Sequence, residues 1–195
     1  ALQRRRMHGE TRRVLVGGTF PMLTAKEIAW LKETVLTSPY PCVVFIHESL
    51  EPECGCVYNR SEALAIFAEA NSRRPGTVRL VVNGHTHKDH FRILDGVAYL
   101  DLNSASYDIS RKHNAYPEEF RKRCGSAYCI LTWNDPLSAV ITLTRSGGLK
   151  IEGSKSSFYL GVTPEMAKWT TLNRGMGTVP WIQSVDLQIE YGAQA

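Results

Sequence analysis

Two stretches of sequence decide the fold of this chain: VVFIH at residues 43–47 and VVNGHTH at residues 81–87. The first closes a continuous apolar, β-branched run, which predicts a strand buried on both faces. The second begins with the last two residues of another apolar run, residues 78–82, which predicts a second buried strand. Residues 61–71 lie between the two runs and carry apolar side chains at helical spacing, with Ser61 as the expected N-cap. A strand, a helix and a strand predict a parallel unit with a crossover helix.

The residues before this unit extend the same pattern. Val14-Leu15-Val16 predicts a short buried strand, and the Thr24 to Glu27 spacing is typical of a capping box at the start of a helix. Ile28, Leu31 and Val35 follow at helical spacing, Trp30 is expected to pack, and Ser38-Pro39 is expected to end the helix. The resulting order, strand, helix, strand, helix, strand, predicts a parallel sheet.

The residues after the unit show antiparallel signals. Asp95-Gly96 separates two apolar runs, residues 91–94 and 97–100, and suits the two-residue turn of a hairpin. Further strands are expected at residues 128–132, 139–144, 149–152 and 185–189. The fold class is therefore α/β: a partly parallel sheet with crossover helices, followed by antiparallel hairpins.

Composition and charge exclude several classes of protein. The chain has 195 residues, of which 43% are hydrophobic and 22% charged, as in ordinary globular domains. No apolar run approaches the roughly 20 residues that span a bilayer, and no signal peptide is recognisable. Residues 1–13 hold five arginines and one glutamate, which accounts for the whole net charge of +4. We expect this segment to be flexible, with an anion-binding arm as the alternative, and the neutral remainder gives no strong nucleic-acid signal.

The five cysteines do not have the spacing of a zinc ribbon. Cys42 opens an apolar run and is expected to be a buried small hydrophobe. Disulfides between Cys54 and Cys56, or between Cys124 and Cys129, are possible pairings that the sequence does not require. The redox compartment therefore stays open.

Three histidines are the candidate metal ligands. His47 follows one predicted strand directly, and His85 and His87 follow the other. Ligands of open α/β sheets bind beyond the carboxyl ends of the strands, and alternate residues of an extended segment share a face. Imidazole is a common ligand of transition metals. The alternative, that His-x-His is ordinary polar surface sequence, stays open, and His90 is expected to be an exposed residue at the start of the hairpin.

Residues 14–107, which contain these motifs, resemble the C-terminal half of a calcineurin-like metallophosphoesterase. The resemblance rests on the strand ending in His47, on Gly84-His85-Thr86-His87, and on the helix that precedes His47. It implies half of a metallophosphoesterase α/β sandwich over residues 14–160, followed by a wrapping tail over residues 161–195. It also implies hydrolysis of phosphate mono- or diesters at a two-metal centre, with His47 and His85 on one metal and His87 on the other.

The chain departs from that family's pattern. The first-half motifs Asp-x-His, Gly-Asp-x-x-Asp and Gly-Asn-His-Asp/Glu do not occur in it. We therefore expect a half-domain that is inactive alone, or a non-catalytic metal-binding or interaction domain that kept the fold. Glu48, Asp89 or Asp101 could complete a metal site.

Several expectations about ligands and partners follow from this comparison. Gly84, Glu48 and Asn103 are candidate cleft-lining residues. The expected cofactors are divalent ions (Mn, Fe, Zn or Ni), and the expected substrate is a phosphate ester. The expected partner is either the missing N-terminal half or a second copy, bound along an exposed edge strand.

Overall fold

The fold is taken from a computed structural model, which describes residues 3–7, 10–15, 18–51, 57–109, 116–124, 130–163, 165–166 and 178–191. The chain divides into two compact units. The first comprises residues 1–83, 92–99 and 191–195, and the second comprises residues 84–91 and 100–190. Within the described residues, no helix combines the length and apolar character needed to cross a membrane.

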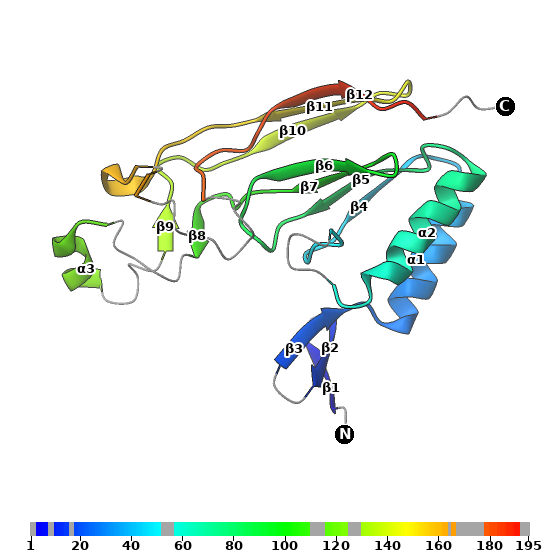
Figure 1. Cartoon of the computed structure of the whole chain (residues 1–195), viewed down its shortest axis with the longest axis horizontal. Coiled ribbons are helices and arrows are strands. Elements are labelled where there is room, and N and C mark those ends of the chain that lie inside the picture. Colours follow the sequence, from blue (N-terminus) through cyan, green and yellow to red (C-terminus); the bar gives the residue numbers. More distant parts are fainter. Residues whose placement is uncertain are drawn as a thin grey trace. The chain divides into compact units, whose positions relative to one another are not determined.

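The first unit contains a parallel β-α-β unit, as the sequence predicts. Strands β4 (Cys42–Phe45) and β5 (Val78–Asn83) pair in parallel, and helix α2 (Arg60–Arg73) connects them. Helix α1 (Ala25–Thr37) lies beside α2 (Figure 1). Apolar side chains of both helices and of the sheet form one core, which includes Leu31, Val35, Ile66, Phe67, Val78, Val81 and Tyr99.

The ends of α1 confirm the predicted signals. The Thr24 side chain accepts a hydrogen bond from the Glu27 backbone, and the Glu27 carboxylate accepts one from the Thr24 backbone. The helix ends at Thr37, and Ser38 is the C-cap.

The N-cap of α2 differs from the prediction. Asn59, not Ser61, is the N-cap, and its side chain makes no capping hydrogen bond. The Asn59 amide instead bonds both backbone polar groups of Leu23, at 2.9 and 3.1 Å. The side chain at this cap therefore fixes the entry to α1 rather than the start of α2.

A mixed, mostly parallel sheet of four strands has the order β4-β5-β7-β6. Strands β6 (His90–Leu94) and β7 (Val97–Asp101) form the predicted hairpin. Asp95 and Gly96 have φ values of 50° and 74°, as a type I′ turn requires. The α/β fold class is thus confirmed.

Two expectations about burial around β4 are wrong. The strand is buried on one face only, because it lies at the edge of the sheet and turns Cys42 and Val44 toward the helices. Phe45, on the other face, is 75% exposed, and Trp30 of α1, expected to pack, is 64% exposed. Cys42 is a free thiol that is only partly buried, although it packs against the core.

The N-terminal residues form a separate antiparallel sheet. Strands β1 (Gln3–Met7), β2 (Glu10–Leu15) and β3 (Gly18–Met22) lie in the order β1-β2-β3. Val14 and Leu15, expected to begin the parallel sheet, therefore lie in β2, which pairs antiparallel with β1 and β3. The flexibility expected for residues 1–13 stays a prediction.

The second unit is built on antiparallel pairs. Strands β10 (Ala139–Leu143), β11 (Gly148–Gly153) and β12 (Val185–Gln188) form one sheet, and β8 (Tyr107–Ile109) pairs with β9 (Ile130–Thr132). The unit also holds helix α3 (Glu118–Cys124) and the short helix η2 (Tyr159–Gly161). Its core comprises Tyr116, Leu131, Trp133, Leu137, Phe158, Val162 and Ile182.

Some expectations fall outside the described residues. Both candidate disulfides involve such residues, because Cys54, Cys56 and Cys129 are not among those described. Much of the expected tail over residues 161–195 is also not described, although its predicted terminal strand is present as β12.

Candidate metal centre

The predicted histidines follow two adjacent parallel strands. Phe45 of β4 lies opposite Val82 of β5 in the register, so the carboxyl ends of the two strands meet at one edge of the sheet. His47 lies two residues after β4, and His85 lies two residues after β5. Both side chains are exposed. The sequence-based placement of these histidines at the carboxyl edge is therefore confirmed, and their role as ligands stays a prediction.

His87 lies in an unusual backbone conformation. Its φ of 53° falls in the left-handed region, which is unfavourable for residues other than glycine. Its ring contacts the Tyr107 ring edge-on, with the centroids 5.0 Å apart. Burial lowers the pKa of His87, and Asp108 opposes that shift through its negative charge. The neutral imidazole, which is the metal-binding form, is therefore favoured.

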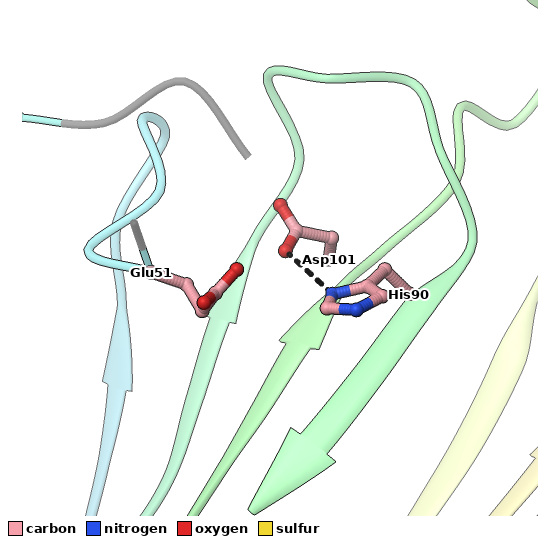
Figure 2. A group of neighbouring side chains, drawn as sticks. All are labelled: Glu51, His90 and Asp101. Carbon is pink, nitrogen blue, oxygen red and sulfur yellow. Dashed lines mark ion pairs between the residues drawn. The ribbon is translucent and has the colours of Figure 1, made fainter. Parts of the chain in front are cut away.

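A second group of donors gathers at the same edge of the sheet (Figure 2). Glu51 follows β4, His90 is the first residue of β6, and Asp101 is the last residue of β7. One ligand atom from each residue lies within 4.8 Å of the others. Glu51 and Asp101 are fully buried, and His90 is partly buried. A nitrogen and two carboxylate oxygens at this spacing could hold a metal ion.

The protein itself supplies partners to these carboxylates. Arg92 lies 2.9 Å from a carboxylate oxygen of Glu51, and His90 Nδ1 lies 3.8 Å from Asp101 Oδ2. The Thr86 hydroxyl donates to Asp101 Oδ1 at 3.4 Å. Thr86 lies between His85 and His87, so this contact ties the histidine loop to the end of β7.

The sequence identified this group only in part. Asp101 is one of the carboxylates predicted to complete a metal site. His90 is predicted to be exposed, but its side chain is only 21% exposed. Its position at the first residue of β6 turns the ring toward Asp101. Glu51 is not among the candidate ligands predicted from the sequence. Its position six residues after β4, near the carboxyl end of that strand, is the signal that points to it. Among the described residues, His47, His85 and His87 do not form a group of this spacing.

The other candidate residues have structural partners. Asn103 is buried, and its amide donates to the backbone carbonyls of Val179 and Trp181 at 2.7 and 3.0 Å. The carboxylate of Asp89 accepts the Gln183 backbone N–H at 3.0 Å, while burial raises its pKa.

Gly84, a candidate cleft-lining residue, has no close contact that requires a glycine. A Cβ atom built there would lie 3.8 Å from the Leu102 carbonyl oxygen, an ordinary contact. Its φ is not among the positive values recorded for glycines of this chain. An alanine would therefore fit at this position.

Glu48 is buried in the first unit, beside a largely apolar pocket. The pocket has a volume of about 200 Å³ and lies between the start of α1 and β4. Its lining includes Leu23, Trp30, Val44, Phe45 and Glu48. Glu48 thus lines an apolar pocket whose lining includes none of the other candidate metal ligands, and its predicted place in a metal-site cleft stays a prediction.

Comparison with known proteins adds no assignment: no family model matches the chain, and no significant match is found among functionally characterised proteins. The site's own geometry is therefore the basis for a functional conclusion.

Proposed function

We propose that this chain supplies the metal-binding half of a metal-dependent phosphoesterase, as its resemblance to calcineurin-like metallophosphoesterases implies. The observation that carries the proposal is the gathering of nitrogen and carboxylate donors at one edge of the four-stranded sheet. Glu51, His90 and Asp101 are close enough to share an ion, and His85 and His87 lie on the adjoining loop.

The donor chemistry fits the implied metals. Mixed imidazole and carboxylate sites accept manganese, iron, zinc or nickel. The lowered pKa of His87, caused by burial, keeps that ring in its ligand form at neutral pH. When bound, a divalent ion would polarise a phosphoryl oxygen and lower the pKa of a bound water. The residues of this chain would hold the ion, and residues supplied from elsewhere would complete the two-metal site.

A second function is favoured by the ion pair between Arg92 and Glu51. The guanidinium already neutralises one of the two buried carboxylates. Buried charges paired in this way also occur as purely structural networks. The competing proposal is therefore an interaction domain that kept the fold and uses this group for stability alone.

Hydrolysis and metal dependence together test the proposal. We expect the chain, loaded with Mn²⁺ or Zn²⁺, to bind the ion and to lose most of this binding in His87→Ala and His90→Ala. His113→Ala is the matched control, because we assign that histidine no role. Hydrolysis of bis-p-nitrophenyl phosphate should be weak without the complementary half.

The two functions differ in the outcome. Metal binding that is unchanged in both histidine variants, or absent from the wild type, would contradict the metal-binding proposal. The absence of binding, with lowered stability in His90→Ala, would instead support the structural function.

A further inference from the structure

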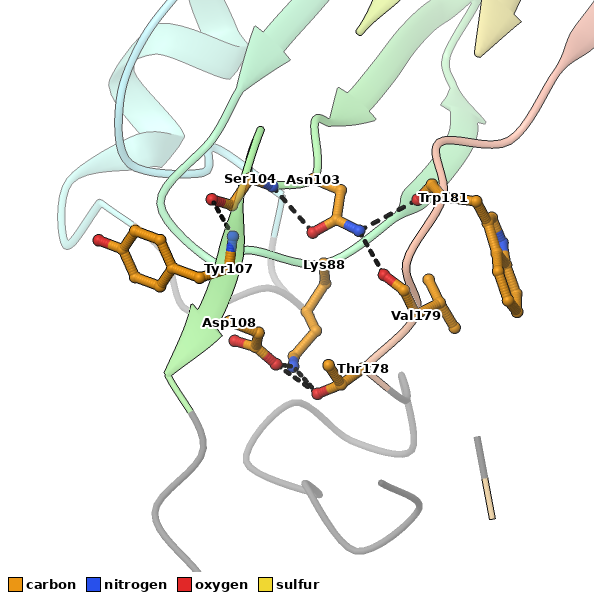
Figure 3. A network of polar contacts seen from close by, with 8 residues as sticks. All are labelled: Lys88, Asn103, Ser104, Tyr107, Asp108, Thr178, Val179 and Trp181. Carbon is orange, nitrogen blue, oxygen red and sulfur yellow. Dashed lines mark hydrogen bonds and ion pairs between the residues drawn. The ribbon is translucent and has the colours of Figure 1, made fainter. Parts of the chain in front are cut away.

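A buried polar group lies beside the histidine loop, outside the donors described above (Figure 3). Lys88, Asp108 and Thr178 are 4%, 3% and 3% exposed. The Lys88 ammonium pairs with the Asp108 carboxylate and donates to the Thr178 hydroxyl at 2.8 Å. The Thr178 hydroxyl in turn donates to the same Asp108 oxygen. Since an unpaired charge is costly at such depth, these three side chains stabilise one another.

The group belongs to a wider set of contacts with segment 178–183. The Asn103 amide donates to the carbonyls of Val179 and Trp181, and the Asp89 carboxylate accepts the backbone N–H of Gln183. Each contact joins a side chain from residues 88–108 to a segment some 70 to 94 positions further along the chain. The segment is therefore fixed to the histidine loop through side chains.

The opposite side of the segment is fixed through the backbone. Ser156 donates to the Pro180 carbonyl at 2.8 Å, and Ile182 donates to the Ser154 carbonyl at 3.0 Å. A Cβ atom at Gly153 would lie only 2.1 Å from the Ile182 carbonyl oxygen, so the segment lies directly against β11. Segment 178–183 is thus a fixed element, against which the loop can be held.

His87 is the residue that this arrangement constrains. It is directly followed by Lys88, and its ring contacts Tyr107, which directly precedes Asp108. The left-handed region is uncommon for non-glycine residues, histidine included, and contacts around such a residue stabilise that conformation. The ion pair between Lys88 and Asp108 fixes the neighbours of both His87 and Tyr107.

We propose that Lys88, Asp108 and Thr178 are positioning residues, which hold His87 in its left-handed conformation and keep its imidazole in place for a metal ion. The part concerning metal rests on the proposed function. The part concerning His87 does not, and it can be tested in metal-free protein.

The test compares two buried threonines of equal exposure. Thr178→Val removes the hydroxyl that Lys88 and Asp108 share, and Thr178→Ser keeps it. Thr77→Val is the matched control in the first unit, where the Thr77 hydroxyl donates to the Arg74 carbonyl at 2.7 Å. NMR of the metal-free chain reports the His87 Cα and imidazole signals, and titration with Zn²⁺ reports affinity.

We expect Thr178→Val to shift the His87 signals and to weaken Zn²⁺ binding about 10-fold, the lower end of the range for partners that bond a metal ligand directly, because Thr178 acts through Lys88 and Asp108. Thr178→Ser should retain both properties, and Thr77→Val should change neither. His87 signals in Thr178→Val identical to those of the wild type would overturn the proposal.

Two further outcomes are decisive. Shifted His87 signals in a chain whose wild type binds no Zn²⁺ would support the positioning role and contradict the proposed function. Should Thr178→Val fail to fold, Asn103→Ala releases the same segment without leaving a buried charge unpaired. That variant must then shift the His87 signals, and unchanged signals would overturn the proposal.

Discussion

Burial changes the acid–base chemistry of single residues in this chain, and Tyr99 is the clearest case. Its side chain lies in the core of the first unit and is only 3% exposed. Burial raises the pKa of Tyr99 to about 12, and the negative charges of Asp95 and Glu51 add to the shift. His87 shows the opposite direction, because burial lowers the pKa of a base. In both residues the neutral form is the one that the fold favours.

A pH-dependent loss of stability follows for Tyr99. The unfolded phenol ionises near its ordinary pKa of 10.0, whereas the folded phenol keeps its proton up to about pH 12. The free energy of unfolding should therefore fall as the pH rises from about 10 to 12, by at most about 1.4 kcal/mol per pH unit. Tyr99→Phe should remove this part of the slope, as measured by urea unfolding at several alkaline pH values.

Tyr40→Phe is the control for that experiment, because Tyr40 is 74% exposed. It should keep the wild-type slope. Equal slopes in Tyr99→Phe and the wild type would show that Tyr99 does not titrate as described.

Local sequence signals predict individual helices and turns, whereas contacts between residues far apart in the sequence could not be predicted. Asp95-Gly96 and the capping box of α1 depend on residues at most three positions apart, so the sequence alone predicts them. The N-cap of α2 could not be predicted, because Asn59 bonds Leu23, 36 positions away. For the same reason the sequence does not reveal the contact of Thr178 with Lys88, because the two residues are 90 positions apart.

The capping box should stabilise helix α1, and removing it should lower the stability of the chain. Thr24→Ala should lower the free energy of unfolding by about 1 kcal/mol, because it removes the acceptor for the Glu27 backbone N–H. Chemical denaturation measures the difference. Thr37→Ala, at the exposed end of the same helix, should cost less than about 0.5 kcal/mol. Equal losses in the two variants would mean that the capping box does not stabilise α1.

The four-stranded sheet carries the candidate site at the carboxyl ends of β4 and β5, and its edge strand β4 exposes the large apolar side chain of Phe45. The strand β4 lies at the edge of the four-stranded sheet, with Phe45 and Val43 exposed. The four β4 residues include no charge and no proline, which are common protections of an edge strand. The expected partner along this edge, a second copy or a complementary half, stays a prediction.

Association through β4 can be measured by sedimentation velocity. We expect the chain to self-associate at about tens of micromolar, and Phe45→Lys to shift it toward monomer, because a charge on an edge strand opposes strand pairing. Tyr159→Lys, which changes an exposed aromatic residue of η2, is the control and should associate like the wild type. A wild-type chain that is monomeric at this concentration would contradict the expectation.

We expect the donors at the carboxyl edge of the four-stranded sheet to hold a metal ion, and the metal content of the purified chain measures this binding. The chain is loaded with Mn²⁺ or Zn²⁺, dialysed and analysed by elemental mass spectrometry, beside His90→Ala and His113→Ala. We expect at least about one ion per chain in the wild type and in His113→Ala, with a clear loss in His90→Ala. A wild-type chain without bound metal, or a metal content that His90→Ala leaves unchanged, would show that these donors do not hold an ion.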